Sequence, residues 1–215
     1  MHGIPSSYIE SVCRLHGPSA TGKLLMRIPG VDLKTQHAEW AGGRWEPYPS
    51  ILDSFFSEER LSPLEPLRIF VTLGTIRGYR FDSVIDALLA TGLANEDTVW
   101  QLGETNRSDV LPGQVYDYMA PDEFARHASE ADVVITHAGV GTLVELLALG
   151  IYPIQAVRRA SRGEHVDDHQ LEIAELVRAS DIGIAVEGPD LTADIVRQAA
   201  SRRIIDGRSA VLEME

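Results

Sequence analysis

The chain has 215 residues, of which 44% are hydrophobic and 24% are charged, as in a globular protein with one large domain or one domain plus a fragment of another. Its formal net charge of -13 argues against nucleic acid as a partner, because phosphate contacts need clustered Lys and Arg side chains. A single cysteine, Cys13, excludes an internal disulfide. The sequence has no apolar window of about 18 residues, so no membrane span is predicted, and it does not open with the basic start and apolar core that predict a signal peptide.

Residues 1–56 differ from the rest of the chain in being rich in proline and having only short periodic runs. The run 31–36 alternates like a strand, and the runs 8–15 and 51–56 are each predicted to form a short helix. We interpret residues 1–56 as the end of a domain and the charged, proline-containing segment 57–66 as a linker.

From residue 67 onward, strand and helix patterns alternate regularly, with short turns between them. The predicted strands are 67–74, 98–102, 114–118, 133–135, 152–157 and 182–186. The predicted helices are 81–91, 121–129, the apolar run that follows Thr142, 166–179 and 191–204. Such alternation implies right-handed crossovers, so residues 67–215 are expected to be an α/β domain with a doubly wound, Rossmann-like parallel sheet that binds its ligand at the carboxyl ends of the strands.

The stretch 133–150, VVITHAGVGTLVELLALG, joins a predicted strand to a predicted helix through a glycine-rich turn. Such a turn directs free backbone N–H groups and the positive end of the helix dipole at an anion, and Gly139 and Gly141 let a ligand approach closely. Thr142 is predicted to be the N-cap, with Glu145 in the first helical turn, where it can accept hydrogen bonds from a pair of sugar hydroxyls. The pattern favours a nucleotide, although a Gly-x-Gly turn is also common packing geometry, His137 alone is more often structural, and the spacing differs from G-x-G-x-x-G.

Three other predicted strand ends carry residues suited to the same ligand. Thr72-Leu73-Gly74-Thr75 can grip a phosphate oxygen or can simply end a strand, and Gln101-Leu102-Gly103 can equally be an ordinary turn. The polar run 158–170 is either a solvated loop or the place where sugar hydroxyls are recognised. The histidines and aspartates at 165–169 fit no compact zinc pattern, so no metal site is predicted, and no G-x-S-x-G nucleophile elbow is present.

The motif HAGVGTLVE, with VTLGT upstream and GEHVDDHQ downstream, resembles the C-terminal, donor-binding domain of GT-B glycosyltransferases of family 28. The likeness runs from about Leu67 to Arg202. Within this group the sequence more closely resembles the catalytic subunit of the two-subunit UDP-N-acetylglucosamine transferase of dolichol-linked oligosaccharide synthesis, and it resembles bacterial exopolysaccharide relatives equally well. The segments YIESVCRLHGPSATGKLL and PGVDLKTQ resemble the last part of the partner subunit, which is the acceptor-side domain. The chain is thus similar to a fused transferase that lacks most of its first domain. Three explanations of the missing half stay open: Met1 is not the natural start, the chain is truncated, or a separate chain supplies that half.

Carried over residue by residue, the resemblance implies a role for each matching position. Glu145 would bind the ribose of a UDP-sugar, Met119 would line the uracil, and His169 and Gln170 would read the donor sugar. The diphosphate would be held by a larger set, namely Gly74, Thr75, His137, Gly139, Gly141 and Thr142. The general base normally comes from the acceptor-side domain, of which Glu10 and His2 are the candidates that remain, and the UDP-sugar is a substrate with no cofactor or divalent metal required.

The resemblance therefore predicts an inverting hexosyltransferase that moves a sugar, N-acetylglucosamine or a related one, to a lipid-linked or glycoside acceptor. One alternative is a nucleotide-sugar-binding subunit that is inactive without a partner chain. Another is a UDP-sugar 2-epimerase, which the partner-like N-terminal segment disfavours, and the glycine spacing disfavours an NAD enzyme. The expected protein is cytoplasmic, peripheral at the inner face of the membrane through a partner, and acts with an acceptor-domain chain or as a homo-oligomer.

Overall fold

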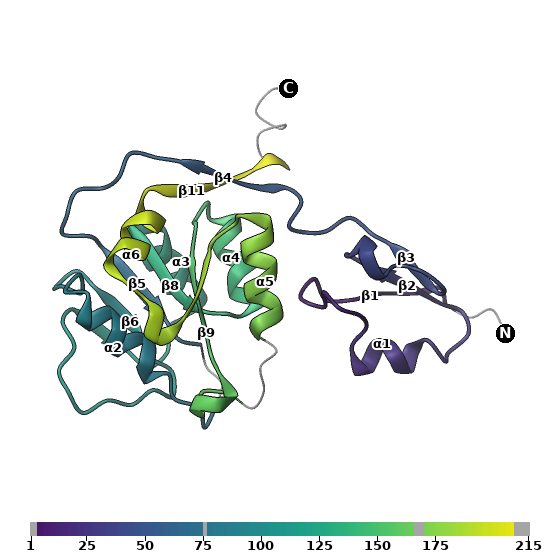
Figure 1. Cartoon of the computed structure of the whole chain (residues 1–215), viewed down its shortest axis with the longest axis horizontal. Coiled ribbons are helices and arrows are strands. Elements are labelled where there is room, and N and C mark those ends of the chain that lie inside the picture. The colour runs from purple at the N-terminus through teal and green to yellow at the C-terminus, as the bar shows by residue number, and fades with distance from the viewer. Residues whose placement is uncertain (1–3, 75–76, 166–169, 209–215) are drawn as a thin grey trace. The chain divides into compact units, whose positions relative to one another are not determined.

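A computed structural model describes residues 4–74, 77–165 and 170–208 of the chain (Figure 1). The chain divides into two compact units, Met1–Ser54 and Phe55–Glu215, and each is described by itself. Nowhere in these described ranges is there a helix long and apolar enough to cross a membrane.

The first unit is a small three-stranded parallel sheet with strand order β1-β2-β3. Its elements are β1 (Ser6–Ile9), α1 (Ala20–Leu25), β2 (Val31–Thr35), the short 3-10 turn η1 (Ala38–Trp40) and β3 (Trp45–Pro47). Leu33 and Trp45 are buried at its centre, and the Trp45 ring meets that of Trp40 edge-on at 5.2 Å between centroids. The predicted strand at 31–36 is confirmed. The predicted helices at 8–15 and 51–56 are wrong, because these residues enter strands and turns instead.

The second unit alternates strands and helices along the chain, as the sequence predicts. Its strands are β4 (Phe55–Glu59), β5 (Ile69–Thr72), β6 (Val99–Gln101), β7 (Gln114–Tyr116), β8 (Val133–His137), β9 (Ile154–Val157), β10 (Ile184–Glu187) and β11 (Arg202–Asp206). Its helices are α2 (Asp82–Ala90), α3 (Pro121–Glu130), α4 (Val140–Ala148), α5 (Gln170–Ser180) and α6 (Ala193–Ala200), with 3-10 turns η2 (Ala160–Arg162) and η3 (Gly188–Asp190).

Six of these strands form one parallel sheet with the order β10-β9-β8-β5-β6-β7. The chain starts in the middle, builds outward from β5 to β7, and then returns to β8 on the other side of β5. This is the strand order of the Rossmann fold, whose ligands bind where the direction of winding reverses. All residues of β5 and β9 are buried, as expected for strands with helices on both faces. The predicted fold class is thereby confirmed.

Helices α3 and α4 cover one face of this sheet around a common apolar cluster. The cluster contains Phe70 of β5, Val134 of β8, Ala128 of α3 and Leu146 of α4. Phe70 also meets Phe124 of α3 edge-on at 5.3 Å between ring centroids. Since side chains alternate along a strand, Thr72 at the end of β5 faces the same side as Phe70, toward the first turns of these two helices.

The predicted linker at 57–66 begins too early, because residues 57–59 belong to strand β4. This strand pairs antiparallel with β11, in register from Phe55↔Asp206 to Glu59↔Arg202, and the two strands run side by side in Figure 1. The predicted helix at 191–204 correspondingly ends at Ala200, and the rest becomes β11. The compact units meet at residues 54 and 55 rather than 56 and 57.

Candidate functional site

A cavity of about 570 Å³ opens at the carboxyl ends of β5 and β8, the two neighbouring strands at which the winding reverses. We call it the switch-point pocket. It is lined by Thr72, Gly74, Gln101, Met119, Pro121, Phe124, His137, Gly139, Gly141, Thr142 and Glu145. The sheet order brings together residues from four segments that are far apart in sequence. These include Met119 and the described residues that the sequence predicts to hold a diphosphate and a ribose.

The first turn of α4 points unpaired backbone N–H groups at this pocket. The helix begins after Gly139, and its first internal hydrogen bond runs from Leu143 N to the Gly139 oxygen at 2.9 Å. The N–H groups of Val140, Gly141 and Thr142 precede that bond and have no acceptor within the helix. Together with the helix dipole they form a site for an anion.

The structure corrects two details of the predicted turn. Thr142 is not the N-cap: Gly139 occupies that position without a side-chain cap, and Thr142 is the third helical residue. Glu145 consequently lies in the second turn of α4 rather than the first. Gly141 and Glu145 are four residues apart, so they share a face of the helix, and both line the pocket.

The ring of His137 lies between two glycines that come from different strand ends. A Cβ built on Gly74 would come within 2.7 Å of the His137 Cε1, and one built on Gly139 within 2.5 Å of its Nε2. Gly74 also has a φ of +74°, which a residue with a side chain rarely adopts. These two glycines therefore make room for the imidazole, whereas a Cβ on Gly141 would meet no atom within 4 Å.

His137 is held in its neutral form. Burial and, second, the nearby positive charge of Arg158 lower its pKa to about 4, against a smaller opposing effect of the Thr72 backbone. The Nδ1 atom is buried and has no hydrogen-bond partner among the described residues. A neutral imidazole here can offer an N–H to a ligand oxygen without adding a full charge.

The remaining lining combines a polar pair, an apolar wall and a free carboxylate. Thr72 Oγ1 donates to Gln101 Oε1 at 2.8 Å, which leaves the Gln101 amide NH₂ as a donor. Met119 and Phe124 supply apolar surface. The carboxylate of Glu145 is exposed, and no group in the described part of the chain pairs with it. The pocket thus offers a surface for a flat ring, an acceptor for hydroxyls and donors for an anion.

Of the other residues predicted to bind the donor, two are not described by the structure and one lies outside the pocket lining. Thr75 and His169 fall outside the described residues. Gln170 is buried at the start of α5, and its Oε1 accepts a hydrogen bond from Arg158 N at 3.0 Å, so it is not part of the pocket lining. No partner of its Nε2 occurs among the described residues.

The candidates for a general base belong to the first unit. His2 lies outside the described residues, and Glu10 is only 2% exposed. The Glu10 Oε2 accepts from both the backbone N and the Oγ of Ser19, and its Oε1 accepts from the Tyr8 hydroxyl at 3.0 Å. These bonds hold the loop before α1, which is a structural role for this carboxylate.

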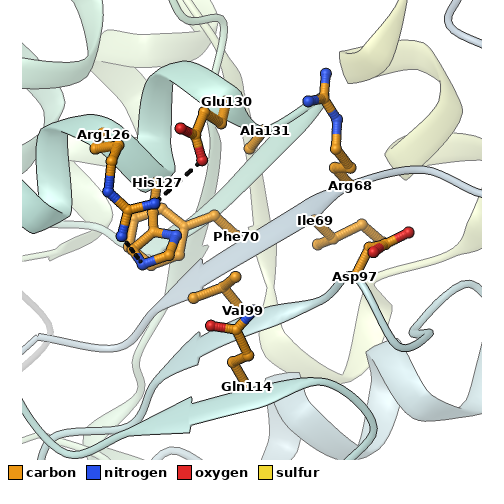
Figure 2. Close-up of a pocket in the computed structure, with 10 residues that line it drawn as sticks. All are labelled: Arg68, Ile69, Phe70, Asp97, Val99, Gln114, Arg126, His127, Glu130 and Ala131. Atoms are coloured by element: carbon orange, nitrogen blue, oxygen red, sulfur yellow. Dashed lines mark hydrogen bonds and ion pairs between the residues drawn. The ribbon is translucent and has the colours of Figure 1, made fainter.

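A second, smaller cavity of about 220 Å³ lies at the opposite, amino-terminal ends of the strands (Figure 2). Its lining includes Phe70, Val99 and the end of α3, where Arg126 bonds both Glu130 and the His127 Nε2. Burial and the Arg126 charge lower the pKa of His127. Ligands of doubly wound sheets bind at the carboxyl ends, so this cavity is the weaker candidate.

Sequence reasoning did not select Pro121 and Phe124 as pocket residues. Both lie in the first turn of α3, the helix that follows β7. The sequence feature that could have indicated them is Pro121, which begins this helix. In the described ranges no three His, Cys, Asp or Glu side chains gather as metal ligands would.

Comparison with known proteins gives the relatives of this chain. Residues 83–198 match the glycosyltransferase family 28 C-terminal domain, which is more than half of the chain. The chain is 31% identical over 141 residues to a UDP-N-acetylglucosamine--N-acetylmuramyl-(pentapeptide) pyrophosphoryl-undecaprenol N-acetylglucosamine transferase of Cupriavidus necator, covering 62% of this chain and 38% of the relative. It is 39% identical over 54 residues to the UDP-N-acetylglucosamine transferase subunit ALG13 of Yarrowia lipolytica, covering 25% of this chain and 26% of that subunit.

Solved structures support the fold. The crystal structure of Acinetobacter baumannii MurG aligns with a TM-score of 0.56 and 18% identity, over 99% of this chain and 59% of that one. The glycosyltransferase SnogD of Streptomyces nogalater aligns with a TM-score of 0.50 and 20% identity, over 86% of this chain and 51% of that one. The chain thus spans less than two thirds of each of these relatives. The family match, together with the switch-point pocket of a Rossmann-like sheet, confirms the resemblance: this chain belongs to the glycosyltransferase family 28 C-terminal domain family.

Proposed function

We propose that this chain is the donor half of a UDP-sugar glycosyltransferase, and that the switch-point pocket binds the nucleotide part of the donor. The observation that carries the proposal is the juxtaposition, in one cavity, of the open first turn of α4, the free carboxylate of Glu145 and the apolar wall of Met119 and Phe124. A diphosphate, a ribose and a uracil are the three groups that such a lining suits. The names of the two relatives supply UDP-N-acetylglucosamine as the first donor to test.

The proposed residue roles follow the geometry of the pocket. The diphosphate lies against the N–H groups of Val140, Gly141 and Thr142 and beside His137 and Gly74, with Thr75 next to it in sequence. Glu145 accepts hydrogen bonds from the ribose hydroxyls. Gln170, whose amide NH₂ has no described partner, reads the donor sugar together with His169.

In the proposed reaction, an acceptor hydroxyl attacks the anomeric carbon of the sugar while the bond from that carbon to the diphosphate oxygen breaks. The configuration inverts in this single displacement, the acceptor proton passes to a base, and UDP leaves with the bonding electrons. The first-turn N–H groups of α4 stabilise the negative charge that develops on the diphosphate, as donors of the oxyanion-hole kind do. We propose that the base comes from the acceptor-side half, and that no divalent metal takes part.

The acceptor is proposed to be lipid-linked or a glycoside, because the C. necator relative is named for a lipid-linked one. A chain that spans 38% of that relative can also be a binding subunit, similar to ALG13, that turns over only with a partner or a second copy. A UDP-sugar 2-epimerase is the less favoured reading.

Calorimetric titration with UDP-N-acetylglucosamine, UDP-glucose, ADP-glucose and GDP-mannose tests the binding proposal. The uridine donors are expected to bind, and Glu145→Gln to weaken them at least about tenfold through loss of the charged acceptor. Asp194→Asn is the matched control, since it removes one charge from a 98% exposed aspartate side chain on α6. If all four donors bind equally well, the pocket does not select uridine. If wild type and Glu145→Gln bind UDP equally well, the assignment of Glu145 to the ribose is contradicted.

Turnover assays separate the transferase, the subunit and the epimerase. Proton NMR of UDP-N-acetylglucosamine with the chain alone detects an epimerised sugar, and addition of lipid extract detects transfer. Transfer that needs the product of an adjacent reading frame supports the subunit reading. Binding of the donor is expected to be unchanged by EDTA, and loss of binding on chelation would refute the metal-free mechanism.

A further inference from the structure

Arg158 is a fully buried cation that follows strand β9 directly, in a polar run that the sequence leaves open as a solvated loop. It is 1% exposed, and its guanidinium lies 4.6 Å from the centre of the Phe81 ring. Burial lowers its pKa to about 10, so it stays charged at neutral pH. A charge placed at such a depth needs a specific set of partners.

Those partners are backbone carbonyls at the two ends of the β5–α2 loop, which we define as residues 73–81. Arg158 Nη2 donates to the Leu73 oxygen at 2.7 Å, where β5 ends, and Nη1 approaches the Tyr79 and Arg80 oxygens at 3.3 and 3.4 Å, just before α2. A single planar fork therefore joins the beginning and the end of this loop. Gly74, which lines the switch-point pocket, is the residue after Leu73.

The Arg158 side chain is itself fixed by a network of buried hydrogen bonds. Its Nη1 also donates to the Glu164 oxygen at 2.9 Å, and the buried Glu164 carboxylate accepts from Arg159 N at 3.0 Å and from Ser83 Oγ of α2. Arg162 extends this network by bonding both Glu164 and Glu187 at the end of β10. The guanidinium consequently cannot swing away from the β5–α2 loop without breaking several buried hydrogen bonds.

The same guanidinium acts on His137. Its positive charge is one of the causes that keep the pKa of His137 low, so Arg158 lies close enough to the pocket for its field to reach the ring. The His137 ring in turn packs against Gly74. Arg158 thus affects both residues that flank the proposed diphosphate site, Gly74 through its bond to Leu73 and His137 through its charge, without lining the pocket itself.

We propose that Arg158 is a positioning residue for the diphosphate: it joins the two ends of the β5–α2 loop and so fixes Gly74 against His137 at the switch-point pocket. This inference rests on the proposed function of that pocket. Arg158 lies outside the pocket, and its proposed contribution is to the part of the donor affinity that comes from the phosphates. The nucleoside part is bound by Met119, Phe124 and Glu145, which Arg158 does not touch.

The test compares UDP with uridine as calorimetric ligands of the whole chain. In Arg158→Met, the affinity for UDP is expected to fall at least about tenfold, since bonds to a charged donor are lost, while the affinity for uridine stays within about twofold. Arg158→Lys keeps the charge, but its single ammonium cannot span both loop ends, so UDP binding is expected to fall while uridine binding persists. Arg197→Met, which removes a half-exposed ion pair with Glu65, is the control with no change in either ligand.

A second readout follows the His137 ring by NMR. Loss of the positive charge in Arg158→Met is expected to raise the pKa of His137, whereas Arg158→Lys leaves it near the wild-type value. This readout needs no ligand, and Arg158→Lys serves if Arg158→Met does not fold.

The outcomes separate the two proposals. A wild-type chain that binds neither UDP nor uridine refutes the proposed function. A wild type that binds UDP, with Arg158→Lys binding UDP equally well, overturns the positioning role alone. An equal loss of UDP and uridine affinity in the folded variants also overturns it, because that is the result of a general structural defect.

Discussion

The imidazole of His137 lies against the Cα of Gly74, so closely that a Cβ on Gly74 would come within 2.7 Å of the ring. His137 is the last residue of β8, and Gly74 lies two residues beyond the end of β5, the neighbouring strand that pairs with β8 from Ile69↔Val133 to Thr72↔Thr136. Both residues line the switch-point pocket. The glycine is therefore required here by a side chain of the protein as well as by any ligand.

Gly74→Ala is expected to destabilise the chain more than Gly78→Ala. Both glycines have a positive φ, +74° and +80°, and so both substitutions cost about 1–2 kcal/mol of backbone strain. A Cβ at Gly78 meets nothing within 4 Å, whereas one at Gly74 meets the His137 ring, which adds about 1–3 kcal/mol of overpacking. Urea unfolding measures the difference. Equal losses would show that the ring moves aside freely, and His137→Ala should recover part of the loss in Gly74→Ala.

Gly141→Ala is expected to separate stability from binding. The residue is helical, and an added methyl meets no protein atom, so the free energy of unfolding should stay the same or rise by up to about 1 kcal/mol. The methyl does occupy the face of α4 that lines the pocket, so UDP should bind about tenfold more weakly. Thermal unfolding and calorimetry on the same sample check both effects. Unchanged UDP affinity would place the phosphates away from the first turn of α4.

The low pKa of His137 predicts a pH-dependent stability. In the unfolded chain the ring takes up a proton near its ordinary pKa of 6.5, whereas the folded state resists protonation down to about pH 4. The folded state is therefore expected to lose stability as the pH falls from about 6.5 to about 4, by at most about 3 kcal/mol from this group.

The comparison that isolates this group is urea unfolding of wild type and His137→Gln at several pH values. Other groups titrate in both proteins, so the difference between the two curves reports His137. The gap in stability between them should shrink as the pH falls through this window. Parallel curves would contradict the assignment.

Strand β4 predicts where the second unit can be cut. Phe55 is buried, β4 pairs with β11 along its whole length, and Arg60 bonds the Ala200 and Asp132 oxygens. A fragment of residues 55–215 is expected to fold like the corresponding part of the whole chain. A fragment of residues 67–215 should melt about 5–10 °C lower, since it loses β4 and leaves β11 unpaired. Circular dichroism melts measure this, and equal melting temperatures would mean that β4 contributes no stability.

Most of the sheet strands were predictable because they are buried apolar runs bounded by turn residues, β7 being the exposed exception. Strands β5 and β8 could be predicted without knowing which strands they pair with, since a strand buried on both faces contains few polar residues. The short runs at 8–15 and 51–56 were misread as helices, because intrinsic propensity is a weak guide over so few residues and pairing in a sheet overrides it. Strand β11 was likewise hidden in a helix prediction, as only its partner β4, far earlier in the chain, makes it a strand.

Most of the pocket was predictable for a related reason. A glycine-rich turn between strand and helix has the same local chemistry wherever it occurs, so His137, Gly139, Gly141, Thr142 and Glu145 could be grouped in one candidate site, and all five line the switch-point pocket. The burial of Arg158, Glu164 and Gln170 could not be predicted, because a run of charged and polar residues is expected to be solvated until the packing around it is known. Thr142 and Glu145 were each assigned three positions too early in α4, since the N-cap depends on backbone angles that the letters do not specify.

The sequence by itself determined the alternation of strands and helices, and with it a parallel α/β sheet and the glycine-rich turn after β8, because these depend on periodicity and on glycine, which act over a few residues. The tertiary structure alone decided that β5 lies beside β8, that His137 rests between Gly74 and Gly139, and that Arg158 is buried under the β5–α2 loop. These contacts join residues about 60 to 85 positions apart, and their energies depend on which strand ends meet at the switch point, a choice made by the packing of the whole sheet.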